Sequence, residues 1–346
     1  MRNQVFFQRS KVFICTAGAV FGLLFQSPAV AQSSDKDVKK MFAPKGTHRA
    51  PFKKADEVAL TSVNLQFKLA TRQEKEKRGV GNVITWGFLE GIDDALLQEI
   101  TDEYYTRLEA KLKENGFSLS EAYKNNKSYQ KLVDNNAGLE RETEKKNWGV
   151  ARIFTANKAP YIEYPTGMTG AHSSLGNDLK IPAGQLFITV DFIDIDQTIK
   201  RGTTDLWGYR SDKFETEIQP VIRIEGITSE SLGKQFKGDG TYAKFTGGNW
   251  SYCNAILQRE YAIVSDIPYA AELDKAKGMP DSMKKFKSAF AGDMAGLFSG
   301  GIVKSGRGVS ENTFVIYADP NAYKAAVLNA LDKYNDYLLA YIKANN

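Results

Sequence analysis

Two spacings of apolar residues alternate along this chain, and together they restrict it to folds that pack helices against a sheet. Apolar residues recur at every second position over residues 58–69, apart from one slip near Thr61 and Ser62 that a β-bulge would explain. They recur every four residues after Asp93 and Asp94, either of which can cap a helix. That helical stripe consists of Leu96, Ile100, Tyr104, Leu108 and Leu112. A period of two is typical of strands and a period near 3.6 of helices, so both element types are expected.

The remaining pattern predicts an α+β fold. Further strands are expected over residues 83–89, 161–164, 185–199, 218–227, 242–245, 250–264 and 313–317, with a charged loop over 72–78. Further helices are expected over residues 121–134 and 280–298, and a closing helix begins at Asp319 and Pro320. Turn residues at 237–240 and 247–249 indicate hairpins. We therefore expect a mixed or antiparallel sheet flanked by amphipathic helices, with a β-hairpin-rich central portion and a C-terminal helix.

The first thirty-one residues have the pattern of a cleavable secretory signal peptide. Arg2, Arg9 and Lys11 precede an apolar run over residues 12–25, and Ala29 and Ala31 are the small residues that a signal peptidase recognises. The run is shorter than the roughly 20 residues that a membrane-spanning helix needs. We expect export, cleavage near Ala31 and Gln32, and a mature protein in the periplasm or on the cell surface.

Removing this segment changes the charge and the cysteine content of the chain. It takes away three basic residues and no acidic ones, so 43 basic residues remain against 41 acidic ones and the net charge falls from +5 to +2. A nearly neutral chain is not expected to bind nucleic acid. Cys253 is then the one remaining cysteine, so no internal disulfide can form and the fold must rest on its apolar core. We expect Cys253 to be a buried, unreactive thiol.

The chain divides into three parts by composition. Residues 1–31 are the signal peptide, residues 32–56 a polar N-terminal arm, and residues 57–346 a single α+β domain. A β-rich insertion at about 200–262 within that domain is an open alternative. No internal repeat separates the domain further.

Histidine is the commonest general base in enzymes, and this chain has only His48 and His172. His48 lies in the polar arm. His172 lies in a Gly- and Ser-rich segment over residues 167–176, which is interpreted either as a ligand loop with His172 and Ser174 as binding residues or as a surface loop. A catalytic Ser–His pair is not expected, because adjacent residues rarely form one and no third group orients them.

One acidic cluster and one set of aromatic residues are the other candidates for binding. Asp194 and Asp196 would share a face of a regular strand and could hold a calcium ion, whereas Asp191 would point the other way. A solvated strand end is the alternative, and no metal or other cofactor is expected. The aromatic candidates for ligand binding are Trp207, Tyr209, Trp250 and Tyr252, with ordinary sheet packing as the alternative.

The order of elements resembles a known family. A strand over residues 58–69, a long amphipathic helix that ends Lys113-Glu114-Asn115-Gly116-Phe117, a strand over 185–196 and a terminal strand plus helix follow one another. This order is similar to that of the periplasmic domain of curli-secretion-channel proteins and related envelope proteins with a TolB-amino-terminal-like fold. The lipidated amino-terminal cysteine of the curli channel proteins is missing here. The resemblance implies an envelope setting more than an activity.

These features lead to three hypotheses of function. The first is an exported, non-enzymatic envelope protein that acts in binding, scaffolding or surface assembly, with an envelope protein or a surface polymer as partner. The second is a secreted hydrolase or ligand-binding enzyme that uses the segment from Gly167 to Gly176. The third is a subunit of an oligomeric outer-membrane assembly, which implies a homo-oligomer and peripheral association with the membrane.

Overall fold

The structure is a computed structural model that describes residues 35–42, 47–77, 81–145, 148–163, 171–204, 206, 212–227, 240–276, 279–283 and 309–345. Its helices are α1 (Asp35–Met41), α2 (Asp94–Glu114), α3 (Lys127–Asn136), α4 (Ala171–Leu179) and α7 (Pro320–Ala344). Its strands are β1 (Thr47–His48), β2 (Glu57–Lys77), β3 (Gly81–Glu90), β4 (Ser118–Leu119), β5 (Glu142–Lys145), β6 (Gly149–Thr155), β7 (Ala183–Lys200), β8 (Lys213–Ile224), β9 (Tyr242–Gly247), β10 (Ser251–Ile256), β11 (Ile263–Val264), β12 (Ala270–Ala276) and β13 (Val309–Ala318).

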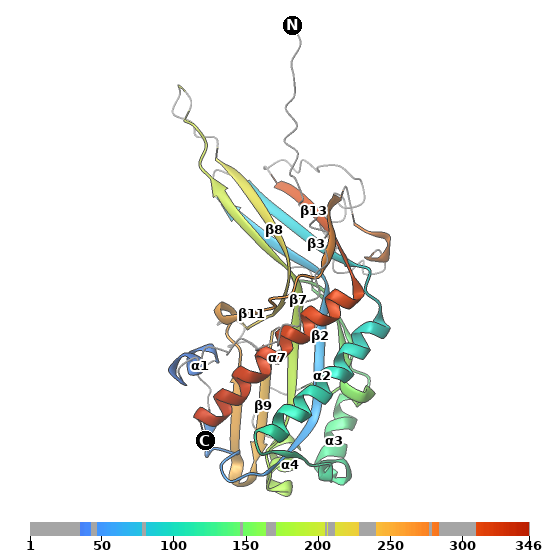
Figure 1. The fold of residues 1–346 in the computed structure, drawn as a ribbon, viewed down its shortest axis with the longest axis vertical. Helices are drawn as coiled ribbons and strands as arrows, with labels where there is room; N and C mark the ends of the chain where they lie inside the picture. The colour runs from blue at the N-terminus through green and yellow to red at the C-terminus, as the bar shows by residue number, and fades with distance from the viewer. Residues whose placement is uncertain are drawn as a thin grey trace, which may run out of the picture. The chain divides into compact units, whose positions relative to one another are not determined.

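These thirteen strands form one mixed sheet, which confirms the α+β class (Figure 1). Its main path runs β1-β10-β9-β7-β2-β3-β13-β12, and the other strands pair alongside it. β2 is parallel to β7, and β3 is parallel to β13, whereas β7, β9 and β10 are antiparallel neighbours. In the first of these parallel pairs, β2 is buried from residue 58 to 72 and packs against α2, and β7 packs against α4, as expected for parallel strands.

The long strand β2 confirms one prediction and corrects another. Its pairing with β7 shifts register between Leu60 and Ser62, where the sequence predicted a bulge. The loop predicted over residues 72–78 was wrong, because β2 continues to Lys77 and pairs with β3 along that stretch. Charged residues occur there because the end of the strand is exposed: residues 74–77 all face solvent. A strand that projects beyond the core can therefore carry charges without being a loop.

Helices α2 and α7 lie side by side across one face of the sheet (Figure 1). Each begins where the sequence predicted: Asp93 accepts a hydrogen bond from the Leu96 amide at 2.9 Å, and Asp319 accepts one from the Ala322 amide at 2.8 Å. Their apolar faces are buried. Salt bridges link the exposed flanks, from Lys324 to Glu99 at 2.6 Å and from Arg107 to Asp332 at 2.8 Å.

One buried hydrogen bond joins the two helices. The Tyr104 hydroxyl donates to Asn335 Oδ1 at 2.9 Å, and both side chains are wholly buried. We expect Tyr104→Phe to lower the free energy of unfolding by about 1–2 kcal/mol, because the Asn335 carbonyl oxygen loses its donor where water cannot replace it. Urea denaturation measures this change. The neighbouring half-buried Tyr105 is the matched control, and an equal loss in Tyr105→Phe would contradict the assignment.

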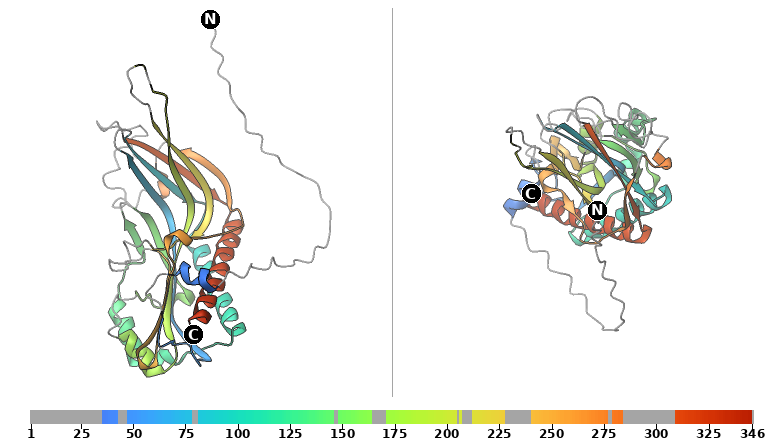
Figure 2. Two further views of the ribbon diagram at one scale, coloured as in Figure 1. Left: turned by 90° about the vertical axis from the view of Figure 1, so that its left-hand side faces the viewer. Right: turned by 90° about the horizontal axis from the view of Figure 1, so that it is seen from above.

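Helices α3 and α4 pack against each other on the opposite side of the sheet from α7 (Figure 2). The single helix predicted over residues 121–134 is instead a 3₁₀ turn (Ala122–Asn125) followed by α3. The break falls at Asn126, whose side chain accepts a hydrogen bond from the Ser128 amide at 2.7 Å and so caps a new helix.

Two central strands change partners along their length. β7 pairs with β9 over residues 183–187 and with β8 over residues 190–200. β2 pairs with β6 up to Thr71 and with β3 from Ala70 onward. Figure 1 shows β9 alongside the lower part of β7 and β8 alongside its upper part.

Other expectations differ from the structure. The described part of the N-terminal arm, residues 35–42 and 47–56, is packed onto the domain, since Val38, Phe42 and Phe52 belong to the main core. The strand predicted over 161–164 is wrong for its described part: residues 161–163 have no regular structure, and β6 supplies the strand next to β2. Cys253 is buried, as expected, and burial raises the pKa of its thiol to about 11.

Some predictions fall on parts of the chain outside the described residues. These are the signal peptide, the turn at 237–239 and all but the first residues of the helix at 280–298. The turn at 247–249 is described and does join β9 to β10. Pro220 lies in β8 and pairs with β7. The pairing of β8 with β11 covers Arg223 and Ile224 and does not extend to Pro220, whose other side is therefore an edge position, as expected for a proline. None of the helices in the described part of the chain is both long and apolar enough to cross a membrane.

Candidate functional site

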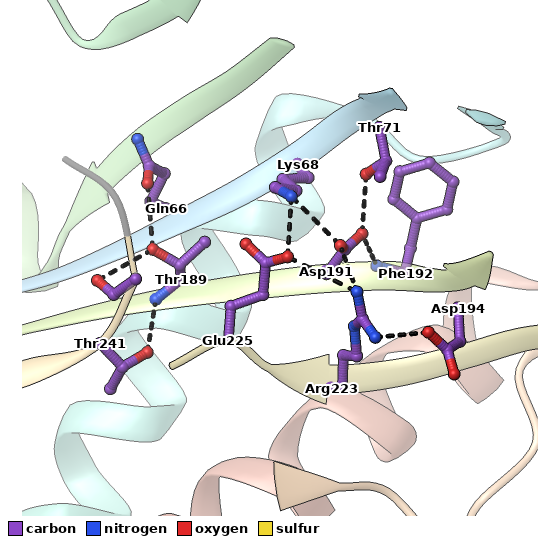
Figure 3. Close-up of polar contacts among 11 residues, drawn as sticks. Gln66, Lys68, Thr71, Thr189, Asp191, Phe192, Asp194, Arg223, Glu225 and Thr241 are labelled. Carbon is purple, nitrogen blue, oxygen red and sulfur yellow. Dashed lines mark hydrogen bonds and ion pairs between the residues drawn. The ribbon is translucent and has the colours of Figure 1, made fainter. Parts of the chain in front are cut away.

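A row of opposite charges crosses the sheet where its central strands change partners. Asp191 on β7 lies directly opposite Arg223 on β8, and Lys68 on β2 approaches Asp191 from the other side (Figure 3). The row therefore alternates positive, negative and positive over three adjacent strands. Cross-strand pairs of opposite charge stabilise a sheet, but Lys68 and Asp191 are buried and Arg223 is only 23% exposed, which is unusual for charged groups.

A bulge in β8 lies beside this row. The pairing of β7 with β8 shifts register between Asp191 and Ile193, where Phe192 of β7 stands opposite two residues of β8, 221 and 222. The Phe192 amide donates to Asp191 Oδ1 at 2.8 Å, and the Phe192 carbonyl accepts from the Tyr269 hydroxyl. Bulges often redirect side chains beside functional sites. Beside this bulge, Asp191 and Asp194 both pair with the guanidinium of Arg223.

Lys68 is the hub of the ion pairs. Its ammonium nitrogen lies 3.2 Å from Asp191 Oδ2 and 2.8 Å from Glu225 Oε1, and the side chain is only 3% exposed. Thr71 donates from its hydroxyl to Asp191 Oδ1 at 2.8 Å. The wholly buried Asp191 carboxylate thus has a charged or polar partner on each oxygen, as a buried charge requires.

Arg223 completes the cluster. Its guanidinium reaches Asp194 at 2.5 Å, Asp191 at 3.4 Å and Glu225 at 3.7 Å. These three carboxylates raise the pKa of Arg223 against the effect of its burial. The Lys68 ammonium also lies 4.5 Å from the centre of the Trp148 ring, so an aromatic face covers the cation.

The two inner carboxylates differ in their protonation. The positive charges of Lys68 and Arg223 outweigh burial and hold the pKa of Asp191 well below its usual range. Burial raises the pKa of Glu225 to about 7, and the neighbouring negative charge of Asp191 adds to this effect against the opposing charge of Lys68. Near neutral pH, Glu225 therefore gains a proton while Asp191 stays ionised.

This cluster forms one wall of a polar cavity of about 350 Å³, which we call the charged cavity. Four cationic side chains and two carboxylates line it, namely Lys68, Arg72, Arg223, Arg259, Asp194 and Glu225. Arg72 pairs with Glu74 at 2.8 Å, whereas Arg259 is exposed and makes no ion pair within the described residues. The volume falls within the range of small-ligand sites. Lys68, Arg72 and Arg223 are paired with carboxylates, two of which, Asp191 and Glu74, do not line the cavity. The lining itself therefore presents more cations than carboxylates to a ligand.

Hydrogen bonds extend the polar character of the sheet below the charged cavity. The Thr189 hydroxyl donates to Gln66 Oε1 at 3.0 Å, and the Thr189 amide donates to the Thr241 hydroxyl at 3.1 Å (Figure 3). All three side chains are wholly buried. Buried polar groups that satisfy one another hold a site in a fixed arrangement.

The proposed calcium ligands lie at the edge of this site. Asp194 is bound by Arg223, and Asp196 is exposed opposite Glu217 on β8. Asp194 and Asp196 share a face, as predicted. Asp191 and Asp194 nevertheless both pair with Arg223, beside the shift in register between β7 and β8. Within the described residues, no group of three or more histidine, cysteine, aspartate or glutamate side chains is arranged to hold a metal ion.

His172 and Ser174 lie on a helix, not on the Gly- and Ser-rich loop that the sequence predicted. Both belong to α4, where His172 is buried and Ser174 half-buried; residues 164–170 lie outside the described chain. Burial, with the nearby charge of Lys244, lowers the pKa of His172 to about 3. His172 is therefore neutral at physiological pH and too weak a base for proton abstraction there.

Two of the four aromatic candidates fall on described residues. Trp250 and Tyr252 lie at the hairpin between β9 and β10, and Ser173 of α4 borders the same pocket. The Trp250 side chain is 61% exposed. Trp207 and Tyr209 lie outside the described residues. The structure thus brings α4 and the hairpin together at the end of the sheet remote from the charged cavity (Figure 1).

The sequence analysis missed most of the charged cavity. Lys68 occupies a position of the period-two run that alternates with apolar residues, where a lysine is ordinarily exposed to solvent. Arg223 and Glu225 follow Pro220, which indicated an edge strand and so exposed side chains. One signal was available: Lys68 and Asp191 interrupt the two most apolar strands of the chain at positions flanked by buried residues. Charges there need partners, but only the pairing of β2 with β7 identifies them.

Comparison with known proteins does not assign the chain to a family. No protein-family model matches the chain. Neither a curated protein nor a solved structure matches it.

Proposed function

We propose that this chain is an exported binding protein of the cell envelope and that the charged cavity binds a small anionic ligand. The observation that carries the proposal is the excess of cations over carboxylates in the lining of a partly enclosed polar cavity. Export is supported by the signal-peptide pattern of residues 1–31, and an envelope setting by the element order that resembles envelope proteins.

The chemistry of the lining favours a carboxylate, sulfate or phosphate group. A guanidinium offers several N–H donors in one plane, which match the oxygens of such groups. Arg259 lines the charged cavity, is exposed and makes no ion pair within the described residues, so it is the lining cation that we propose meets an incoming anion. The protonated form of Glu225 removes one negative charge from the wall and strengthens this preference.

Anion binding is expected to depend on Arg259 and on pH. Isothermal titration of the purified protein with sulfate and with succinate should give saturable binding at pH 6, weaker binding at pH 8, and a loss of about tenfold in Arg259→Ala. Sulfate keeps its charge between pH 6 and pH 8, so any change in its affinity over this range arises from titration of the protein. Binding falls as pH rises because Glu225 becomes negative.

Lys200 offers the matched control, since it is 71% exposed and lies on β7 outside the charged cavity. Lys200→Ala should bind both anions as the wild type does. Equal losses in the two variants would show a general effect of charge, and an absence of saturable binding to either anion would contradict the proposal.

A hydrolase is the second candidate, and one observation favours it. Glu225 with a raised pKa beside an ionised Asp191 is the arrangement that lets two carboxylates act as acid and base. Glu225→Gln separates the two functions. A binding protein keeps its affinity for sulfate in this variant, whereas a hydrolase loses turnover of nitrophenyl ester or glycoside substrates by a hundredfold or more.

A further inference from the structure

A second pocket, at the other end of the sheet, is lined by aromatic and hydroxyl side chains. It has a volume of about 420 Å³ and lies between the β9–β10 hairpin, β1 and α4. Its lining is mostly apolar and includes His48, Ser173, Thr246, Trp250, Ser251 and Tyr252. We call it the aromatic pocket. It shares no lining residue with the charged cavity.

The backbone of the hairpin is strained at this pocket. Asn249 and Trp250 have φ values of 56° and 58°, in the left-handed region that bulky side chains rarely adopt. Two contacts from distant segments hold them there: the Trp250 amide donates to Asn177 Oδ1 at 3.1 Å, and Arg49 donates to the Asn249 carbonyl at 2.7 Å. Such strain persists only where the surroundings enforce it and is concentrated at functional sites.

The strain places a large apolar side chain in water. Asparagine and glycine are the residues that suit a left-handed position, yet the hairpin carries tryptophan there, 61% exposed. Neither burial nor turn geometry explains this choice. A ligand that covers the indole does explain it.

The ring system beside Trp250 is already ordered. His48 of β1 stacks on Tyr252 of β10, with ring centres 5.5 Å apart and planes inclined by 26°. β1 is held there because His48 pairs with Tyr252 in the sheet. The pocket therefore offers flat aromatic faces that need little rearrangement on binding, which favours affinity.

The chemistry of the lining selects one class of ligand. No carboxylate borders the pocket among the described residues, and its polar groups are hydroxyls together with the imidazole of His48. A hexose ring has an apolar C–H face that packs on aromatic rings and a rim of hydroxyls that hydrogen-bond to serine and threonine. We propose that the aromatic pocket binds a hexose unit of a glycan, with Trp250 as the face on which the sugar ring stacks.

Three trisaccharides test this proposal: cellotriose, maltotriose and tri-N-acetylchitotriose, titrated calorimetrically into the purified protein. At least one should bind saturably, and its binding should shift the fluorescence of the exposed indole to shorter wavelength. Trp250→Gly should weaken that binding by about tenfold or more, because the stacking face is lost. Trp250→Phe, which keeps an aromatic face, should stay within about threefold of wild type.

Trp250→Gly separates binding from folding. Glycine suits the left-handed backbone, so the melting temperature of this variant should equal or exceed that of the wild type while sugar binding is lost. Tyr317, which is 42% exposed on β13, is the control: Tyr317→Ala should leave sugar binding unchanged. The inference is overturned if none of the three sugars binds, if Trp250→Gly binds as the wild type does, or if only an aromatic peptide such as Gly-Trp-Gly binds.

Discussion

Replacing Lys68 by methionine is expected to lower the free energy of unfolding by about 3–5 kcal/mol, the largest effect of a single change outside the apolar core. Asp191 is wholly buried, and Lys68 is its closest cation. Methionine has a similar length, so the cavity that it leaves is small. The loss arises instead from a buried carboxylate whose main counter-charge is gone. Urea denaturation at pH 7 measures it.

A control and a second variant separate this cause from general disruption. Lys200→Met, at an exposed ion pair with Glu215, should change stability by less than about 0.5 kcal/mol. Adding Asp191→Asn to Lys68→Met should recover much of the loss, because the amide carries no charge to be compensated. If Lys68→Met costs less than about 1 kcal/mol, water must reach Asp191 and the cluster is not buried as described.

The stability of the wild type is expected to fall as the pH rises from 5 to 8, by about 2–3 kcal/mol from Glu225 alone. Glu225 has a pKa of about 7 in the folded chain and an ordinary carboxyl pKa of 4.5 when unfolded. Between these values the folded state binds more protons than the unfolded state. The stabilisation is therefore complete below pH 4.5 and is lost as the pH rises through 7.

Glu225→Gln removes this dependence, since glutamine does not titrate. Denaturation curves of the wild type and the variant at pH 5, 6, 7 and 8 should differ most at pH 8, where the variant gains relative to the wild type. The pKa of Asp191, held low by Lys68 and Arg223, acts in the opposite direction and only in the acid range. Parallel curves for the two proteins from pH 5 to 8 would rule out a raised pKa at Glu225.

The two proposed sites differ in how visible they are from sequence. Trp250 and Tyr252 could be selected as candidates because aromatic residues in a turn stand out whatever their neighbours are. Their companions could not be foreseen, since His48 and Ser173 reach the pocket from segments about 200 and 80 residues away. His172, selected because histidine is a common base, lies buried behind the hairpin.

The elements that the sequence predicted well are those with a long, regular apolar period. The helices after Asp93 and Asp319 begin at the expected caps, and the strands around residues 58–69 and 185–199 are present, including the bulge near Ser62. Local spacing determines such elements because burial of one face repeats every two or four residues. The prediction was wrong where charged residues replace the apolar period, as in β2 beyond Arg72. An exposed strand and a loop have similar composition, so the sequence could not distinguish them there.

The sequence by itself determined the α+β class, the main helices and strands, and the burial of Cys253. Only the tertiary structure decided that Lys68, Asp191, Arg223 and Glu225 form one cluster. Their meeting depends on the parallel pairing of β2 with β7, on the bulge of β8 opposite Phe192 and on the change of partner from β9 to β8. A one-residue slip in either pairing would turn these charges to the other face, and register is a property of paired strands that no single strand encodes.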